Sequence, residues 1–398
     1  MAFMTVAHYL QILERSWKNQ DGNKTAQFLS LRHDHAKFPN YQVEQAEGIV
    51  DKFLTSPLDE LVCLHFKCLF YIGKQDFLEA YQAQSTLVQC FAKIMQSQKE
   101  ENWSLPIMYI IASDLRLVAQ LAEKQRVGST ENPGEILEKA AECLMGCFRV
   151  CAADNRSADE DTKRIGMLGL VNQLFKVYFR INKLHLCKPL IRAIESSQFK
   201  EIFPLGQQVT YRYFVGRKSM YDSNYKAADE YLTYAFENCH KTSRKNKKLI
   251  LTYLVPVKML LGYIPSRQVL EKYGIVDEFW DLVKAVCQGN LKLFDELMDK
   301  HESFFITSGI YLIIDKLKII AYRNLFRKVY LILNTHQIPV ESLQRALESL
   351  GQDADLDETE CLVANLIYQG KIKGYISHQH RKVVVSKQNP FPPLTSLS

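Results

Sequence analysis

A succession of paired helical segments is the feature that most constrains how this chain can fold. Apolar residues recur every three or four positions along most of the sequence before about residue 370, which is the pattern of helices that bury one face. Short turns join several segments in pairs, at residues 73–76, 182–183, 222–224 and 289–290. Because one helix pair cannot bury its apolar face alone, we expect successive pairs to stack into a solenoid.

One pair also follows the packing pattern of a tetratricopeptide-type repeat. Small residues allow two helices to approach closely, and large residues fill the groove between neighbours. The positions that follow this pattern are Gly216, Tyr225, Ala228, Leu232 and Ala235. The sequence therefore predicts an all-α, tetratricopeptide-like helical-repeat array.

The C-terminal part of the chain has a different pattern. Three helical segments, at 322–336, 338–351 and 355–370, precede two segments that read as strands around a turn, at 371–380 and 381–387. An isolated hairpin is only marginally stable in water, so these strands must pack on the third helix. Three helices and a two-stranded wing predict a winged-helix subdomain at the end of the array.

The pattern divides the chain into four predicted regions. They are an N-terminal helical-repeat array at 1–205, the helical part of a second domain at 206–321, the winged helix at 322–388 and a proline-rich extended tail at 389–398. The N-terminal residues predict an amphipathic helix rather than a secretory leader. Pro256 and Lys258 interrupt the apolar stretch 249–264, so we expect no membrane span.

Opposite charges gather at two places in the predicted winged helix. The third helix begins among carboxylates, and Asp357 with Glu360 predicts a capping box there. These carboxylates would repel phosphates, so we do not expect this helix to read the major groove.

The wing, in contrast, is basic. The residues predicted to contact a nucleic-acid backbone without regard to sequence are Lys371, Lys373, Arg381, Lys382 and Lys387. Two other uses of the wing remain open. It is either a charged hairpin that protects the edge of a sheet, or an edge that pairs with a partner protein.

No catalytic motif stands out in the sequence. Ten cysteines without a CxxC pair indicate a reducing compartment, and the row Cys143, Cys147 and Cys151 fits small packing residues on one helix face. The histidine pairs in "RHDH" and "SHQH" lack the further ligands that a metalloenzyme needs. We therefore expect no catalytic residue, no metal site and no cofactor. The basic segment 241–248 fits a solvated helix end, a site for an acidic ligand or a nuclear-import signal.

A helical array that runs into a winged helix resembles the PCI domain, a scaffold module of the proteasome lid, the COP signalosome and translation initiation factor three. The residues that carry this resemblance are the Gly289–Asn290 turn, the helices of 304–333 and the module 338–387. Four segments further resemble the PCI subunit of the nuclear transcription-and-export complex, namely 100–109, 170–194, 216–232 and 374–394.

This resemblance implies a non-catalytic scaffold subunit of the nuclear mRNA-export complex, located in the nucleus and at nuclear pores. It implies three partners: a large scaffold subunit related to germinal-centre-associated nuclear protein, a small acidic disordered polypeptide shared with the proteasome lid, and RNA or DNA. The alternative is a purely protein-binding PCI subunit of a proteasome-lid or COP-signalosome-like assembly.

The charge pattern suggests where an acidic partner would bind. The net charge of +6 permits such a partner without requiring one. Cations among aromatic and aliphatic residues suit an acidic peptide with apolar anchors. The residues predicted for this role are Lys316, Lys318, Arg323, Arg327 and Lys328. The alternative is ordinary charge on a helix surface.

Overall fold

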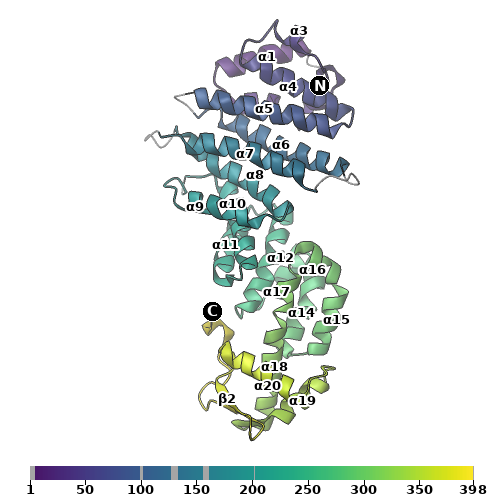
Figure 1. Cartoon of the computed structure of the whole chain (residues 1–398), viewed down its shortest axis with the longest axis vertical. Helices are drawn as coiled ribbons and strands as arrows, with labels where there is room; N and C mark the ends of the chain where they lie inside the picture. Colours follow the sequence, from purple (N-terminus) through teal and green to yellow (C-terminus); the bar gives the residue numbers. More distant parts are fainter. Residues whose placement is uncertain (1–4, 99–101, 127–132, 156–160, 201, 398) are drawn as a thin grey trace. The chain divides into compact units, whose positions relative to one another are not determined.

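The chain divides into two compact units, Met1–Tyr211 and Arg212–Ser398, which we call the N-terminal unit and the C-terminal unit (Figure 1). The boundary falls inside helix α10 (Leu205–Tyr221). The computed structural model describes residues 5–98, 102–126, 133–155, 161–200 and 202–397.

Helices that alternate between two layers build the N-terminal unit. Its α-helices are α1 (Val6–Lys18), α2 (Gly22–Phe28), α3 (Glu47–Val50), α4 (Leu58–Gly73), α5 (Phe77–Ser97), α6 (Leu105–Gln125), α7 (Glu135–Ala152), α8 (Met167–Arg180) and α9 (Cys187–Glu195). Short 3-10 helices are η1 (Asp34–Lys37), η2 (Pro39–Tyr41), η3 (Lys163–Gly166) and η4 (Leu184–Leu186). Each of α4 to α8 packs on the next, while α5 also packs on α7 and α6 on α8 (Figure 1). This stack is the helical-repeat array that the paired segments predict.

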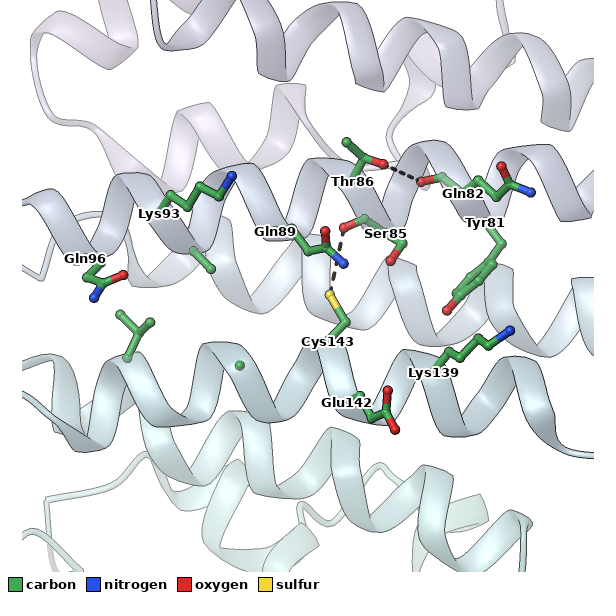
Figure 2. Close-up of a pocket in the computed structure, with 13 residues that line it drawn as sticks. Tyr81, Gln82, Ser85, Thr86, Gln89, Lys93, Gln96, Lys139, Glu142 and Cys143 are labelled. Atoms are coloured by element: carbon green, nitrogen blue, oxygen red, sulfur yellow. Dashed lines mark hydrogen bonds between the residues drawn. The ribbon is translucent and has the colours of Figure 1, made fainter.

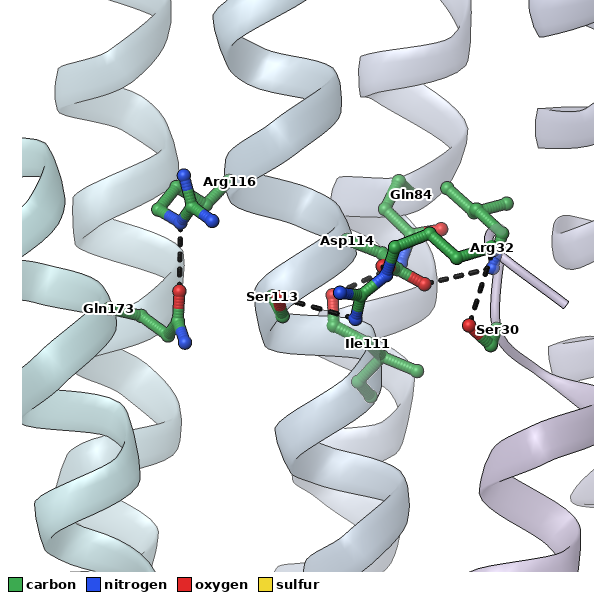
Figure 3. Close-up of polar contacts among 9 residues, drawn as sticks. Ser30, Arg32, Gln84, Ile111, Ser113, Asp114, Arg116 and Gln173 are labelled. Atoms are coloured by element: carbon green, nitrogen blue, oxygen red, sulfur yellow. Dashed lines mark hydrogen bonds and ion pairs between the residues drawn. The ribbon is translucent and has the colours of Figure 1, made fainter. Parts of the chain in front are cut away.

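A buried carboxylate ties the start of this unit to its centre. Asp114 of α6 is 1% exposed and accepts hydrogen bonds from the backbone N–H of Leu31 at 2.9 Å and from Nε of Arg32 at 3.0 Å (Figure 3). Burial raises the pKa of Asp114 although both partners favour its charged form. The segment after α2 is therefore fixed against α6 by a charged group that has its partners inside the fold.

Helix α6 is also long and apolar enough, by length and composition alone, to cross a membrane. It is not the apolar stretch 249–264, which the sequence shows to be interrupted by Pro256 and Lys258. In the structure 56% of the relevant window of α6 is buried, and the helix packs between α5 and α7, which is the usual position of a core helix.

The predicted turns are present, although the left-handed residue is not always the one expected. Gly and Asn usually take this conformation. Asn182 does so with φ of 55°. In the turns at 73–76 and 222–224, however, Gln75 and Ser223 have the positive φ, because Asp76 and Asn224 cap the following helices through their side chains.

The C-terminal unit continues the helical pattern and ends in a small sheet. Its helices are α11 (Tyr225–Asn238), α12 (Arg244–Leu260), α13 (Arg267–Tyr273), α14 (Val276–Gln288), α15 (Leu291–Lys300), α16 (Glu302–Ser308), α17 (Tyr311–Asp315), α18 (Lys318–Leu333), α19 (Val340–Glu348), α20 (Leu356–Tyr368) and the 3-10 helix η5 (Leu394–Ser396). Its strands are β1 (Gln337–Pro339), β2 (Gly374–Ser377) and β3 (Lys382–Val385).

Two glycines set close helix contacts in this unit. A side chain at Gly216 would lie 2.7 Å from Cγ of Leu232, which confirms the small-against-large packing expected of a tetratricopeptide-type pair. Gly289 ends α14 with φ of 64°, and a Cβ there would lie 2.4 Å from the backbone nitrogen of Leu325 in α18. Asn290 then caps α15 by accepting a bond from the N–H of Leu293, so the Gly289–Asn290 turn is confirmed.

The winged helix has its own hydrophobic core, which α18, α19, α20 and the sheet share. Its buried residues include Phe326, Val340, Leu343, Leu366 and Val383. The sheet has three antiparallel strands in the order β1-β3-β2. The sequence pattern predicts only the two strands of the wing. It does not reveal β1, because three residues that end at a proline show no alternation of apolar and polar side chains.

The cap of α20 also differs from the prediction. Asp355, not Asp357, is the N-cap residue, and its capping box is completed by Glu358, not Glu360. The cap therefore lies two residues earlier than expected, so Asp357 and Glu360 do not form the capping box and make other contacts. The overall class is nevertheless confirmed, since a helical-repeat array is followed along the chain by a winged helix.

Candidate nucleic-acid and partner interface

The strand register decides which wing side chains face away from the core. Val383 and Val385 of β3 are buried, so Lys382 and Val384 lie on the outer face of the sheet. Tyr375 pairs with Val384 and Ser377 pairs with Lys382. Tyr375 is 63% exposed. The outer face therefore places an exposed aromatic ring and a lysine on neighbouring strands.

The outer face carries no carboxylate on the described strands. Besides the residues of β2 and β3, it receives Gln337 of β1, which is paired with Val384. Lys373 lies two residues before Tyr375 and Lys387 two residues after β3, and both are exposed. Among the described residues, neither of these lysines nor Lys382 has an ion-pair partner. Three of the five predicted nucleic-acid residues therefore keep their charge available.

The other two predicted residues are differently placed. Lys371 is half-buried, and burial together with the nearby Arg323 guanidinium lowers its pKa. Its Nζ donates to Oε1 of Gln369 at 2.9 Å. Arg381 lies at the turn of the hairpin, and its Nη1 donates to the carboxylate of Asp357 at 2.8 Å.

A second contact joins the same two elements. Nδ1 of His378 lies 2.7 Å from the Glu360 carboxylate, which is 12% exposed. The acidic start of α20 and the basic hairpin, which looked like separate charged surfaces, are thus partly paired with each other. Within the described part of the chain, no group of three or more His, Cys, Asp or Glu residues is arranged to hold a metal ion.

Arg323, predicted to contact an acidic partner, is instead 5% exposed. Its Nη2 donates to the carbonyl of Pro392 at 2.6 Å and its Nε to the carbonyl of Lys371 at 3.3 Å. The guanidinium also lies 5.8 Å from the Phe391 ring centroid. Burial lowers the pKa of Arg323. This residue therefore holds residues 391–392, which belong to the predicted proline-rich extended tail at 389–398, on α18.

The other four predicted partner residues divide into two pairs. Lys316 donates to Oγ of Ser223 at 3.2 Å and to the Tyr225 hydroxyl at 2.9 Å. Lys318 forms an ion pair with Asp295 at 2.8 Å. Both ammonium groups have partners inside the unit.

Arg327 and Lys328 are exposed, and Arg327 borders a groove of about 480 Å³. The lining of this groove contains no Asp or Glu among the described residues. It is made of Met259, Gly262, Ile264, Val286, Cys287, Ile320, Arg323, Asn324, Arg327, Asn389, Phe391, Pro393, Leu394 and Thr395.

Several exposed apolar residues of the winged helix escaped the sequence analysis. Leu331 and Ile332, at the end of α18, are 61% and 81% exposed, and Tyr368, the last residue of α20, is 90% exposed. Leu331 and Ile332 come four residues after the exposed Arg327 and Lys328, so they lie on the same outward face of α18. Exposed apolar residues that are neighbours, as Leu331 and Ile332 are, are typical of a surface that another molecule covers.

The histidines of "RHDH" also have a partner that the sequence did not show. Nδ1 of His33 lies 3.1 Å from Nδ1 of His35, and Nε2 of His35 lies 2.9 Å from Nε2 of His65 in α4. His65 is fully buried and packs beside Phe66. Burial is the main cause that lowers the pKa of His35 to about 4, and the neighbouring His33 contributes to the shift. His35 and His65, whose pKa values burial lowers, are therefore neutral core residues at neutral pH.

The three-cysteine row is buried in the same way. Cys147 and Cys151 are buried, Cys143 is half-buried, and all three are free thiols. Burial raises the pKa of Cys151 to about 12 and that of Cys143 to about 11. These thiols are protonated packing residues at neutral pH.

Comparison with known proteins places this chain among PCI-domain sequences. The PCI domain family matches residues 298–387. PCI domain-containing protein 2 of Xenopus laevis is 53% identical over all of both chains. The PCI domain-containing protein 2 homolog of Drosophila melanogaster is 53% identical over 99% of this chain and 100% of its own length. A protein named Protein CSN12 homolog, of Neurospora crassa, is 31% identical over 96% of this chain and 92% of its own length.

Proposed function

Because the chain belongs to the family of PCI domain-containing protein 2, we propose that it is a non-catalytic scaffold subunit of the nuclear mRNA-export complex. PCI proteins are scaffold subunits of multi-subunit assemblies. In this proposal the winged helix joins that of a large scaffold partner, a small acidic polypeptide binds the C-terminal unit, and the wing binds RNA or DNA. The chain then acts in the nucleus and at nuclear pores, and no membrane takes part.

The observation that carries the nucleic-acid role is the outer face of the wing sheet. Lys382 and Tyr375 lie on this face, Lys373 and Lys387 flank it, and the described strands place no carboxylate there. Lysines bind phosphates without reading sequence, and an exposed tyrosine ring stacks on an unpaired base. This combination favours single-stranded nucleic acid over a duplex, whose bases are already stacked.

The proposed scaffold partner would bind the winged helix at surfaces other than the basic outer face of the sheet. Strand β2 forms one edge of the sheet, so one side of its backbone is free to pair with a strand from another chain. The exposed Leu331 and Ile332, at the end of α18, supply a second, apolar area for a protein partner. The proposed large subunit therefore docks beside the basic face and extends it.

The acidic polypeptide has a narrower candidate site than the charge pattern suggested. Arg327 and Lys328 are exposed, and the acid-free groove beside Arg327 offers apolar contacts from Ile264 and Phe391. An acidic segment with apolar anchors would find both kinds of contact there. Arg323 also lines this groove, but its guanidinium is bound to the C-terminal segment, and Lys316 and Lys318 are paired with other residues of the unit.

The proposal is tested by charge reversal on the outer face. The triple variant Lys373→Glu, Lys382→Glu and Lys387→Glu is compared with Lys24→Glu, Lys52→Glu and Lys188→Glu, which changes the net charge equally in the exposed surface of the N-terminal unit. Fluorescence anisotropy measures the affinity for a labelled single-stranded RNA, with the chain alone and with its scaffold partner. We expect the affinity for RNA to fall at least tenfold in the first variant and to be unchanged in the second. The wild type should bind RNAs of different base composition equally well. Equal losses for both variants would place the binding elsewhere.

A purely protein-binding subunit of a proteasome-lid or COP-signalosome-like assembly is the second candidate. The exposed apolar end of α18 favours it, because that surface suits a protein better than a nucleic acid. Affinity purification with and without nuclease separates the two. Recovery of several PCI subunits without RNA supports the second candidate, and RNA-dependent recovery of export factors supports the first.

A further inference from the structure

A groove of about 760 Å³ runs between α5 and α7 in the N-terminal unit, far along the sequence from the wing (Figure 2). One rim is formed by exposed polar side chains of α5, and the other by side chains of α7. The lining includes Gln82, Gln89, Lys93 and Gln96 of α5, and Lys139, Glu142 and Gly146 of α7.

Several of the residues that line the groove between its rims have small side chains. Sγ of Cys143 lies 3.8 Å from the carbonyl oxygen of Ser85, which is where the two helices meet (Figure 2). Further along, Ala92 and Gly146 line the groove. A Cβ built on Gly146 would meet no atom within 4 Å. The groove is therefore open above this glycine, and it has room for the backbone of another chain.

The α5 rim presents one glutamine every seven residues. Seven residues advance an α-helix by about 10.5 Å and turn it through two full turns less about 20°. Gln82, Gln89 and Gln96 therefore lie almost in line along α5. Among the described residues, none of the three amides has a hydrogen-bond partner. Each amide offers both a donor and an acceptor.

This spacing matches the repeat of an extended peptide. Three residues of a polyproline II segment span about 9.3 Å, and three residues of a β-strand span about 10 Å. A chain in either conformation has no internal hydrogen bonds, so its peptide groups need partners from outside. The glutamine row offers one side-chain amide as a hydrogen-bond partner for every third peptide group. The difference between the glutamine spacing and the peptide repeat is small, and flexible glutamine side chains can adjust to it.

The charges along the groove indicate the kind of peptide. Lys93 has no ion-pair partner within the described residues, and Lys139 pairs only with Glu135 at the exposed surface. Glu142 is the single acid of the lining. At its far end the groove adjoins a second hollow, which shares Gln96 and Val150 with it and is lined by the exposed Arg149. The second hollow also contains Lys163 and Asp154, and the Asp154 carboxylate accepts hydrogen bonds from Thr162 and from the N–H of Lys163. Together the two hollows hold more cations than acids, which favours acidic side chains on the ligand.

We propose that the α5–α7 groove binds an extended, acidic peptide segment of a partner protein, with its peptide groups on the glutamine row and its carboxylates toward Lys93 and Arg149. The site is independent of the wing and of the Arg327 surface. It gives the scaffold a docking position in its helical array as well as in its winged helix.

The test uses the full chain and three labelled peptides of equal length. The probe is (Pro-Pro-Asp)4, which is extended in solution and offers one peptide N–H in every three residues. The controls are (Pro-Pro-Lys)4 and a helix-forming peptide with the same number of aspartates. Fluorescence anisotropy should give at least tenfold tighter binding for the probe than for either control. Equal binding of the helical acidic peptide would overturn the assignment of an extended ligand.

Matched glycine variants locate the binding. Gly146→Phe fills the groove, whereas Gly48→Phe places the same ring at a helical glycine of α3 where a Cβ would likewise meet no atom within 4 Å. We expect Gly146→Phe to weaken probe binding at least tenfold, Gln89→Ala to weaken it several-fold, and Gly48→Phe to leave it unchanged. Thermal unfolding of each variant verifies that it is folded. Unchanged probe binding by a folded Gly146→Phe variant would overturn the site.

Discussion

Nη1 of Arg381, at the turn of the wing, lies 2.8 Å from the carboxylate of Asp357 in the first turn of α20. The two side chains are 40% and 74% exposed, so the pair contributes little to stability. Its effect is on charge. Asp357 forms an ion pair with Arg381, which the sequence predicts to contact nucleic acid. Its carboxylate also adds a negative charge at the edge of the basic surface.

Releasing this cation should strengthen nucleic-acid binding. In Asp357→Asn the guanidinium is free to reach a phosphate, so we expect a several-fold higher affinity for single-stranded RNA. The slope of log affinity against log salt concentration should steepen by about 0.7, the contribution of one additional phosphate contact.

Glu341→Gln on α19 is the matched control, because it removes an equally exposed acid outside the wing and α20. Binding is measured by anisotropy across a salt series. The same gain in both variants would mean that overall charge, and not the release of Arg381, sets the affinity.

Arg323 should matter for folding rather than for partner binding. Arg323→Gln leaves the carbonyls of Pro392 and Lys371 without their charged donor, and we expect the free energy of unfolding to fall by about 2–4 kcal/mol. Amide hydrogen exchange of residues 390–397 should accelerate, because the segment loses its anchor. Arg327→Gln on the exposed side of α18 is the control and should change stability by less than about 0.5 kcal/mol. Unchanged exchange in Arg323→Gln would show that the apolar contacts of Phe391 suffice.

The glycine that ends α14 should be far less tolerant than a similar glycine nearby. Gly289 and Gly274 both have a left-handed backbone, with φ of 64° and 65°. At Gly274 a Cβ meets no atom within 4 Å, so Gly274→Ala should cost about 1 kcal/mol of backbone strain. At Gly289 the Cβ also collides with the backbone of α18, and Gly289→Ala should cost about 3 kcal/mol or more. Urea unfolding compares the two, and equal losses would contradict the close contact of α14 and α18.

The N-terminal unit should lose stability in mild acid. His35 has a pKa of about 4 in the folded chain and an ordinary value of 6.5 when unfolded. The unfolded chain therefore takes up a proton first, and stability falls as the pH drops from about 6.5 to about 4. Between pH 6.5 and 5 this amounts to about 2 kcal/mol for His35, and the buried His65, whose pKa burial also lowers, adds to it.

Urea unfolding at pH 7.5 and pH 5 measures this difference. His65→Leu removes one of the two buried groups, so its stability should depend less on pH than that of the wild type. The exposed His185→Leu is the control and should retain the full dependence. An identical pH dependence in all three proteins would mean that other groups control the acid response.

The sequence predicted the helical array, the winged helix and the Gly289–Asn290 turn, because each depends on residues close together in the chain. It did not predict the pairing of Arg381 with Asp357 or of His35 with His65, since both partners come from separate elements. Arg323 illustrates the limit most clearly. Its position among apolar residues of a helix looks the same whether solvent or the folded-back C-terminus covers it, and only the path of residues 389–397 decides between the two.

That path makes residues beyond the sheet part of the winged-helix fold. The carbonyls of Pro390 and Pro392 accept hydrogen bonds from the N–H of Lys373 and from Nη2 of Arg323. A fragment cut at residue 387, where the match to the PCI family ends, would keep α18, α19, α20 and all three strands. It would nevertheless leave the buried Arg323 guanidinium without one of its acceptors, so the boundary of a stable fragment lies beyond the boundary of the family match.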